Sequence, residues 1–121
     1  MKKLFEYKNF NSLSEQELLE MANVGYDSTG IKNVVLWLGP NPETHGKRIK
    51  VSNLPNKFTG LDCFILTMPK FETIGKVDKT FITPKVLKQI KEFVNLNYQL
   101  ISDYSDYLIS TKELIENLKK I

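Results

Sequence analysis

The sequence contains very few of the residues that build disulfides and metal centres. Cys63 is its only cysteine and His45 its only histidine, so neither an intramolecular disulfide nor a cysteine–histidine metal site can form. Cys63 lies in the apolar run 61–66, where a small buried side chain is expected. The glycines around Lys47 lack the spacing of a P-loop, and a strand pattern follows them where a helix is required. We therefore expect no metal and no cofactor.

Long apolar runs are also absent. No stretch approaches the roughly 20 apolar residues of a membrane-spanning helix. The basic start at residues 1–8 is not followed by the apolar segment of a signal peptide. Together with the single cysteine, these absences predict a cytoplasmic protein without a membrane partner.

The charge is unevenly distributed along the chain. The net charge of the 121 residues is +3, which by itself does not indicate a nucleic-acid partner. Residues 31–60 carry five basic residues against one acid, or +4, whereas residues 61–85 carry +1 and residues 86–121 are neutral. The charge pattern therefore favours a positive patch in the segment 31–60.

Hydrophobic periodicity predicts a single α+β domain spanning residues 1–121, in which consecutive strands precede the main helices. Such strands, joined by short loops, form an antiparallel meander with helices against one face. The expected elements are a short N-terminal helix at 14–23, three to four strands within about 33–77, a long helix at about 84–102 or longer, and a final short helix at 111–120.

Capping residues support the helix assignments. Thr83 and Pro84 have the order of an N-cap and a first helical residue. Ser110 and Glu113 have the spacing of a capping box, as do Ser14 and Glu17. These three pairs of positions are independent of the apolar pattern and agree with it.

Tryptophan, histidine and arginine occur once each, and all three fall within the twelve positions from Trp37 to Arg48. Every other basic residue except His45 is lysine, so an arginine here favours a contact that needs its planar, multi-donor guanidinium. We expect the Arg48 and His45 side chains to be exposed together beside the tryptophan. The candidate binding residues are Trp37, His45, Lys47, Arg48 and Lys50.

Three kinds of function fit these residues. Arginine and tryptophan are typical of the energetic centres of protein interfaces. Basic and aromatic side chains also bind single-stranded nucleic acid, through phosphates and stacked bases. His45 beside Arg48 or Lys47 would suit a metal-independent ribonuclease or toxin. Against these stand two structural roles: His45 holding its loop, and Arg48 in an ion pair with Glu43, Asp62 or Glu72.

The run His45-Gly-Lys-Arg-Ile-Lys-Val-Ser-Asn53, preceded by Trp37, resembles the shared core of a group of small uncharacterised bacterial and mobile-element proteins. The similarity covers about residues 33–120. The resemblance implies that His45, Gly46 and Arg48 belong together, and it implies no activity. The favoured hypothesis is a small non-enzymatic protein, encoded by a phage or mobile element, that docks on another protein and modulates or inhibits it. The alternatives are nucleic-acid binding through residues 31–60 and the ribonuclease.

Overall fold

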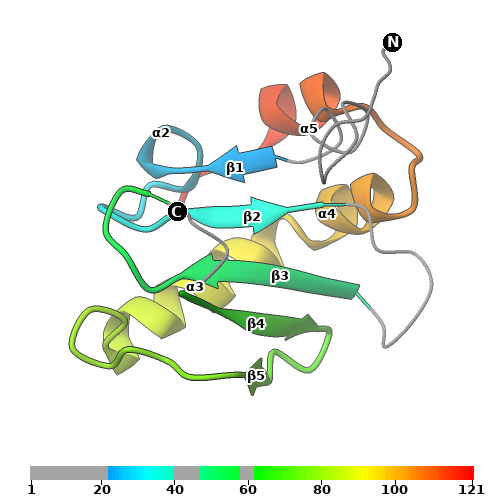
Figure 1. Cartoon of the computed structure of the whole chain (residues 1–121). Coiled ribbons are helices and arrows are strands. Elements are labelled where there is room, and N and C mark those ends of the chain that lie inside the picture. The colour runs from blue at the N-terminus through cyan, green and yellow to red at the C-terminus, as the bar shows by residue number, and fades with distance from the viewer. Residues whose placement is uncertain (1–21, 40–46, 58–61) are drawn as a thin grey trace, which may run out of the picture.

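The computed structural model describes residues 22–39, 47–57 and 62–121, which form a five-stranded sheet with helices (Figure 1). The strands follow the order β1-β2-β3-β4-β5 across the sheet, and each is antiparallel to its neighbours. The predicted α+β fold with an antiparallel meander is therefore confirmed. The strands are β1 Ala22–Val24, β2 Leu36–Leu38, β3 Lys47–Ser52, β4 Cys63–Met68 and β5 Thr73–Ile74.

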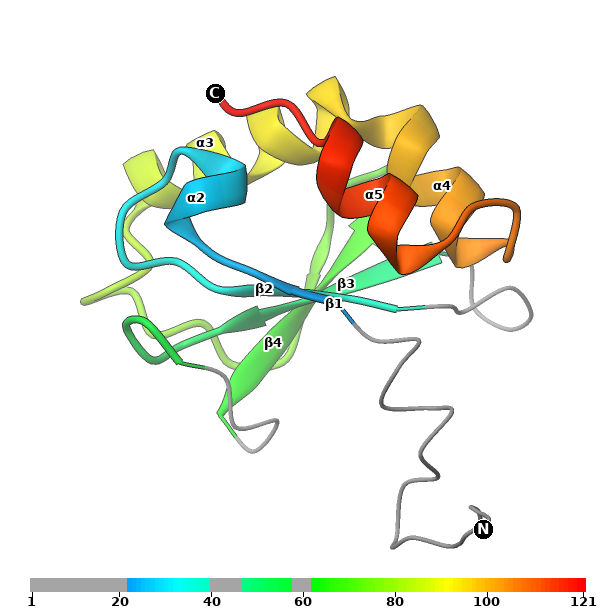
Figure 2. The ribbon, with the colours of Figure 1, turned by 90° about the horizontal axis from the view of Figure 1, so that it is seen from above.

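The helices all lie against one face of the sheet, so the described part of the chain has two layers (Figure 2). On the opposite face the described residues place no helix. No described helix is long and apolar enough to cross a membrane. The helices are α2 Tyr26–Thr29, α3 Pro84–Leu96, α4 Tyr98–Ser105 and α5 Thr111–Asn117.

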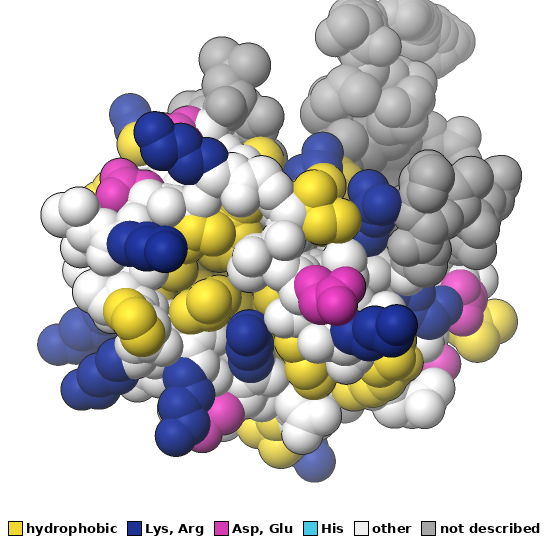
Figure 3. All heavy atoms as spheres, turned by 90° about the horizontal axis from the view of Figure 1, so that it is seen from below, with side chains coloured by type: hydrophobic (Ala, Val, Ile, Leu, Met, Phe, Trp, Pro, Cys, Tyr) yellow, Lys and Arg dark blue, Asp and Glu magenta, His cyan; other side chains and the backbone are white. Residues whose placement is uncertain are grey.

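The core lies between the sheet and the helices. Successive side chains of a strand point to opposite faces, and in β4 burial alternates accordingly from residue to residue. Ile49, Leu66 and Ile90 are fully buried in this core. On the other face, the side chains of the central strands are only half-buried. At the edge formed by β5 and α3, apolar side chains reach the surface between lysines (Figure 3).

The sheet has one strand more than predicted. Ala22 and Asn23, assigned from sequence to the helix 14–23, belong to β1, which pairs with β2 in the register Ala22↔Leu38 and Val24↔Leu36. Ala22 and Val24 are buried by this pairing, whereas Asn23 between them is exposed. Burial within the sheet therefore outweighs the helical pattern of the preceding residues. The remainder of that predicted helix, with Ser14 and Glu17, lies outside the described residues.

The predicted long helix is divided at Asn97. The Asn97 side chain is buried, and its Nδ2 donates to the carbonyl oxygen of Phe93 at 3.0 Å and to that of Lys119 at 2.9 Å. The Lys119 amide donates in return to Asn97 Oδ1 at 2.8 Å. Because this side chain bonds the backbone of another segment, the chain turns here and α4 begins in a new direction.

The predicted caps form as expected. The Thr83 hydroxyl accepts from the Val86 amide at 3.2 Å, with Pro84 as the first residue of α3. Ser110 and Glu113 make both hydrogen bonds of a capping box at the start of α5. At its other end α5 stops at Asn117, three residues before its predicted end, because Leu118 adopts an extended conformation with a ψ of 135°.

Candidate functional site

A row of cross-strand neighbours runs over the open face of the sheet, the face without described helices. Its members are paired in register from β2 to β5: Trp37 with Lys50, Lys50 with Ile65, and Ile65 with Ile74. Trp37, Lys50 and Ile65 are half-buried, and Ile74 is 45% exposed. The row therefore combines one aromatic, one cationic and two aliphatic side chains on a rigid backbone.

The Trp37 ring is held by two contacts. Lys50 Nζ lies over the ring, 4.6 Å from its centroid, within the range of a cation–π interaction. On the same strand face, the six-membered ring lies so close to Gly39 that a Cβ atom there would come within 2.5 Å of Cη2. Only glycine fits beneath this ring. No such role was predicted for Gly39 from the sequence, although a glycine two positions after a strand tryptophan shares its face.

Arg48 lies beside this row. It is two residues from Lys50 along β3, so both side chains lie on the same face, and its partner across the β3–β4 pair is Thr67. The residue is half-buried. Its Nε is buried, and within the described residues no acceptor or carboxylate pairs with it. The predicted ion pairs with Asp62 and Glu72 do not form. A desolvated N–H without a partner is costly, so an acceptor supplied by a ligand would gain more here than at an exposed lysine.

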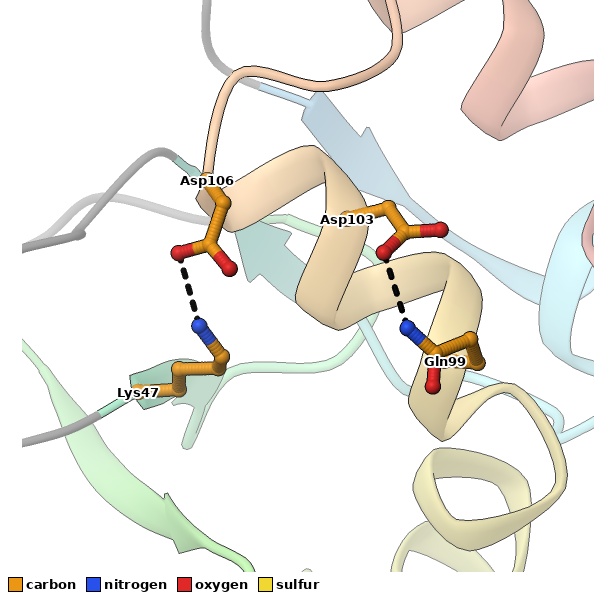
Figure 4. A network of polar contacts seen from close by, with 4 residues as sticks. All are labelled: Lys47, Gln99, Asp103 and Asp106. Carbon is orange, nitrogen blue, oxygen red and sulfur yellow. Dashed lines mark hydrogen bonds and ion pairs between the residues drawn. The ribbon is translucent and has the colours of Figure 1, made fainter.

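Lys47 does not belong to this surface. As the neighbour of Arg48 along β3, it points to the helical layer, where its Nζ lies 2.7 Å from Asp106 Oδ1 (Figure 4). Nearby on α4, Gln99 donates to Asp103 at 2.8 Å. The structure therefore separates Lys47 from the other candidates and gives it a structural partner.

The second half of the run 45–53 is explained by the fold. Ile49 and Val51 are fully buried. The Ser52 hydroxyl donates to the carbonyl oxygen of Lys57 at 2.6 Å and accepts from the Leu54 amide at 3.0 Å. Asn53 is 4% exposed, and its side chain bonds three groups of surrounding loops. Among the described residues of this run, Arg48 and Lys50 are left without a role in the core or the loops.

No protein-family model, curated protein or solved structure matches this sequence. The surface formed by Trp37, Arg48, Lys50, Ile65 and Ile74, here called the sheet-face site, is therefore interpreted from its own chemistry. It combines an aromatic ring, an arginine, a lysine and two aliphatic side chains, and of these residue types aromatics and arginine are enriched at protein interfaces.

The ribonuclease hypothesis depends on His45, which lies outside the described residues, so its predicted position beside Arg48 stays a prediction. Across residues 22–39, 47–57 and 62–121, no three His, Cys, Asp or Glu side chains are grouped so that they could hold a metal ion.

Proposed function

We propose that this protein is a non-enzymatic binding protein that docks its sheet-face site on another protein and thereby modulates or inhibits it. The single observation that carries the proposal is the half-buried Arg48, whose Nε has no acceptor among the described residues, beside the Trp37–Lys50 pair. An acidic side chain of the partner would satisfy the Arg48 guanidinium, and an apolar area would cover Ile65 and Ile74.

Two observations favour a protein partner over nucleic acid at this site. The Trp37 ring is already engaged by Lys50 and Gly39, which leaves it less available for base stacking. Lys47, one of the cations in the basic segment 31–60, is paired with Asp106. The resemblance of residues 45–53 to mobile-element proteins and the scarcity of cysteine add to the proposal a phage or mobile-element origin and action in the cytoplasm.

The decisive experiment compares which partner proteins are captured by the wild-type protein and by a set of variants. Tagged wild-type protein and the variants Arg48→Lys, Arg48→Met and Lys47→Gln are used to enrich partners from host lysate, with and without nuclease. Lys47→Gln is the matched control, because it removes a charge one position from Arg48 on the opposite face. We expect a nuclease-resistant partner that is retained by Lys47→Gln and lost by Arg48→Met.

Arg48→Lys then tests the geometry with the purified partner. Lysine keeps the charge but cannot form the two parallel hydrogen bonds of a guanidinium, so the affinity should fall about tenfold, or about 1.4 kcal/mol. An unchanged affinity for both Arg48 variants would remove this residue from the interface. A wild-type protein that cleaves RNA in the presence of a chelator, with the cleavage abolished by His45→Ala, would replace the binding function with the ribonuclease.

A further inference from the structure

A second group of exposed cations follows the edge formed by the β4–β5 turn, the segment after β5 and the start of α3. Figure 1 shows β5, this segment and the first turns of α3 along the lower edge of the molecule. Between residues 70 and 88 the chain has five lysines against two acids, a net charge of +3. All five side chains are exposed, and together they define the lysine face: Lys70, Lys76, Lys79, Lys85 and Lys88.

These lysines are not neutralised by the protein. In the described residues, the ion pair found is Lys47–Asp106, and no lysine of the lysine face takes part in one. Of the two acids in this segment, Asp78 accepts from the Thr80 amide through Oδ1 at 3.1 Å within its own turn, and neither forms an ion pair with these lysines in the described residues. The positive charge is therefore available to a ligand.

The backbone that carries the lysines is fixed. The buried Asn53 side chain donates to the carbonyl oxygen of Lys76 at 2.9 Å and accepts from the Asp78 amide at 2.9 Å. These two hydrogen bonds fix the backbone of residues 76–78. The amide of Ile82 then bonds the Asp78 carbonyl oxygen at 2.7 Å, just before the Thr83 cap of α3. A preorganised set of charges loses less freedom on binding than a mobile loop does.

Apolar side chains lie among the lysines. Figure 3 views this edge and shows yellow apolar surface bordered by dark blue lysine side chains. Two aromatic residues of the same segments, Phe71 and Phe81, are partly buried against the core and keep part of their surface exposed. The edge therefore offers both phosphate-binding charge and surface against which bases can pack.

We propose that the lysine face binds single-stranded nucleic acid. Lysine is depleted in protein interfaces, so five lysines and no arginine argue against a second protein contact. Insertion into a membrane needs apolar side chains that protrude, whereas Phe71 and Phe81 are half-buried. A duplex would present its phosphates but not its bases to the apolar area. This surface lies on different residues from the sheet-face site and does not depend on the function proposed for that site.

The test uses the full chain and a labelled oligothymidylate as probe, with binding followed by fluorescence anisotropy at several salt concentrations. The affinity should fall log-linearly with salt, with a slope near −3 if about four phosphates are each worth roughly 0.7. The variant Lys76→Gln/Lys79→Gln/Lys85→Gln/Lys88→Gln should lose most of the affinity and most of the slope.

The matched control is Lys32→Gln/Lys57→Gln/Lys112→Gln/Lys120→Gln. It also removes four positive charges, but from exposed positions outside the lysine face. We expect this control and Arg48→Met to bind the oligonucleotide within about threefold of wild type, less than the loss of one good stacking contact. Thermal unfolding checks that both quadruple variants fold. Equal losses in both quadruple variants would show that net charge alone drives binding and would overturn the proposal. So would an absence of binding by wild type, or tighter binding to a duplex or to phosphatidylserine vesicles.

Discussion

Lys50 Nζ lies 4.6 Å from the centroid of the Trp37 ring, across the β2–β3 pair and directly opposite in register. This cation–π pair lies on the open face of the sheet beside Arg48. Because Trp37 is the only tryptophan, the tryptophan emission of the protein reports on the surroundings of this one ring.

Replacing Lys50 with Gln should therefore change the tryptophan emission and lower the free energy of unfolding by about 0.5–1 kcal/mol, the contribution of a partly exposed cation–π pair. Fluorescence spectra and urea unfolding measure the two effects. Lys50→Arg is the control, because it keeps a cation over the ring and should keep the wild-type emission. Identical spectra for Lys50→Gln and wild type would show that the pair does not persist in solution.

The close approach of Trp37 and Gly39 predicts an unusual cost for adding one methyl group. Gly39→Ala should displace the ring, shift its emission and lower the free energy of unfolding by about 1–3 kcal/mol. Gly25→Ala is the matched control, since a Cβ there meets no heavy atom within 4 Å and Gly25 has a φ of −117°. We expect Gly25→Ala to change stability by less than about 1 kcal/mol and to leave the emission unchanged.

Tyr107 occupies a position that favours glycine. It follows the end of α4 with a φ of 64°, and the Leu108 amide donates to the carbonyl oxygen of Asp103 at 2.8 Å, as in a Schellman motif. The Tyr107 side chain is 58% exposed. Tyr107→Gly should therefore raise the free energy of unfolding, by about 0.5–1 kcal/mol, as measured by thermal or urea unfolding.

Tyr107→Ala separates the backbone from the ring. Alanine also removes the aromatic side chain, but its Cβ retains the strain of the left-handed conformation, so no gain in stability is expected. If Tyr107→Gly were destabilising, contacts of the ring in solution would have to outweigh the relief of that strain.

Asn97 links the α3–α4 junction to the C-terminal segment through two hydrogen bonds with the Lys119 backbone, and its Nδ2 also donates to the carbonyl oxygen of Phe93 in α3. Asn97→Ala removes the buried side chain that bonds the amide and carbonyl of Lys119, and should lower the free energy of unfolding by about 2–4 kcal/mol. Hydrogen exchange should show the loss first in residues 118–121. Asn95→Ala, two positions earlier and exposed, should change stability by less than about 0.5 kcal/mol. Equal effects of the two substitutions would contradict the role assigned to Asn97.

The sequence predicts the parts of the fold that depend on local patterns. The alternation of Ile49 and Val51 with Arg48 and Lys50 predicts the two faces of β3, and the structure confirms it. The caps at Thr83 and Ser110 are local hydrogen-bond patterns, and both form as expected. These features depend on residues within a few positions of one another, so the sequence contains the necessary information.

The sequence also predicts which residue types the candidate site contains. It does not show which of the candidate residues lie together on one face of the sheet. Lys47 was grouped with Arg48 because they are adjacent, yet adjacent strand residues point to opposite faces and Asp106 lies 59 positions away. The charge counts along the sequence did not reveal the lysine face, for a related reason. Its charges fall in the windows 61–85 and 86–121, which are nearly neutral when counted separately.

By itself, the sequence determined the α+β class, the order of the central strands, the starts of α3 and α5, and the occurrence of the single arginine and the single tryptophan within twelve positions. The tertiary structure decided the fifth strand, the break at Asn97, the separation of Lys47 from Arg48 and the tight contact between Trp37 and Gly39. The physical reason is distance along the chain. Hydrogen bonds and burial that join segments tens of residues apart outweigh local preference, and no local pattern records them.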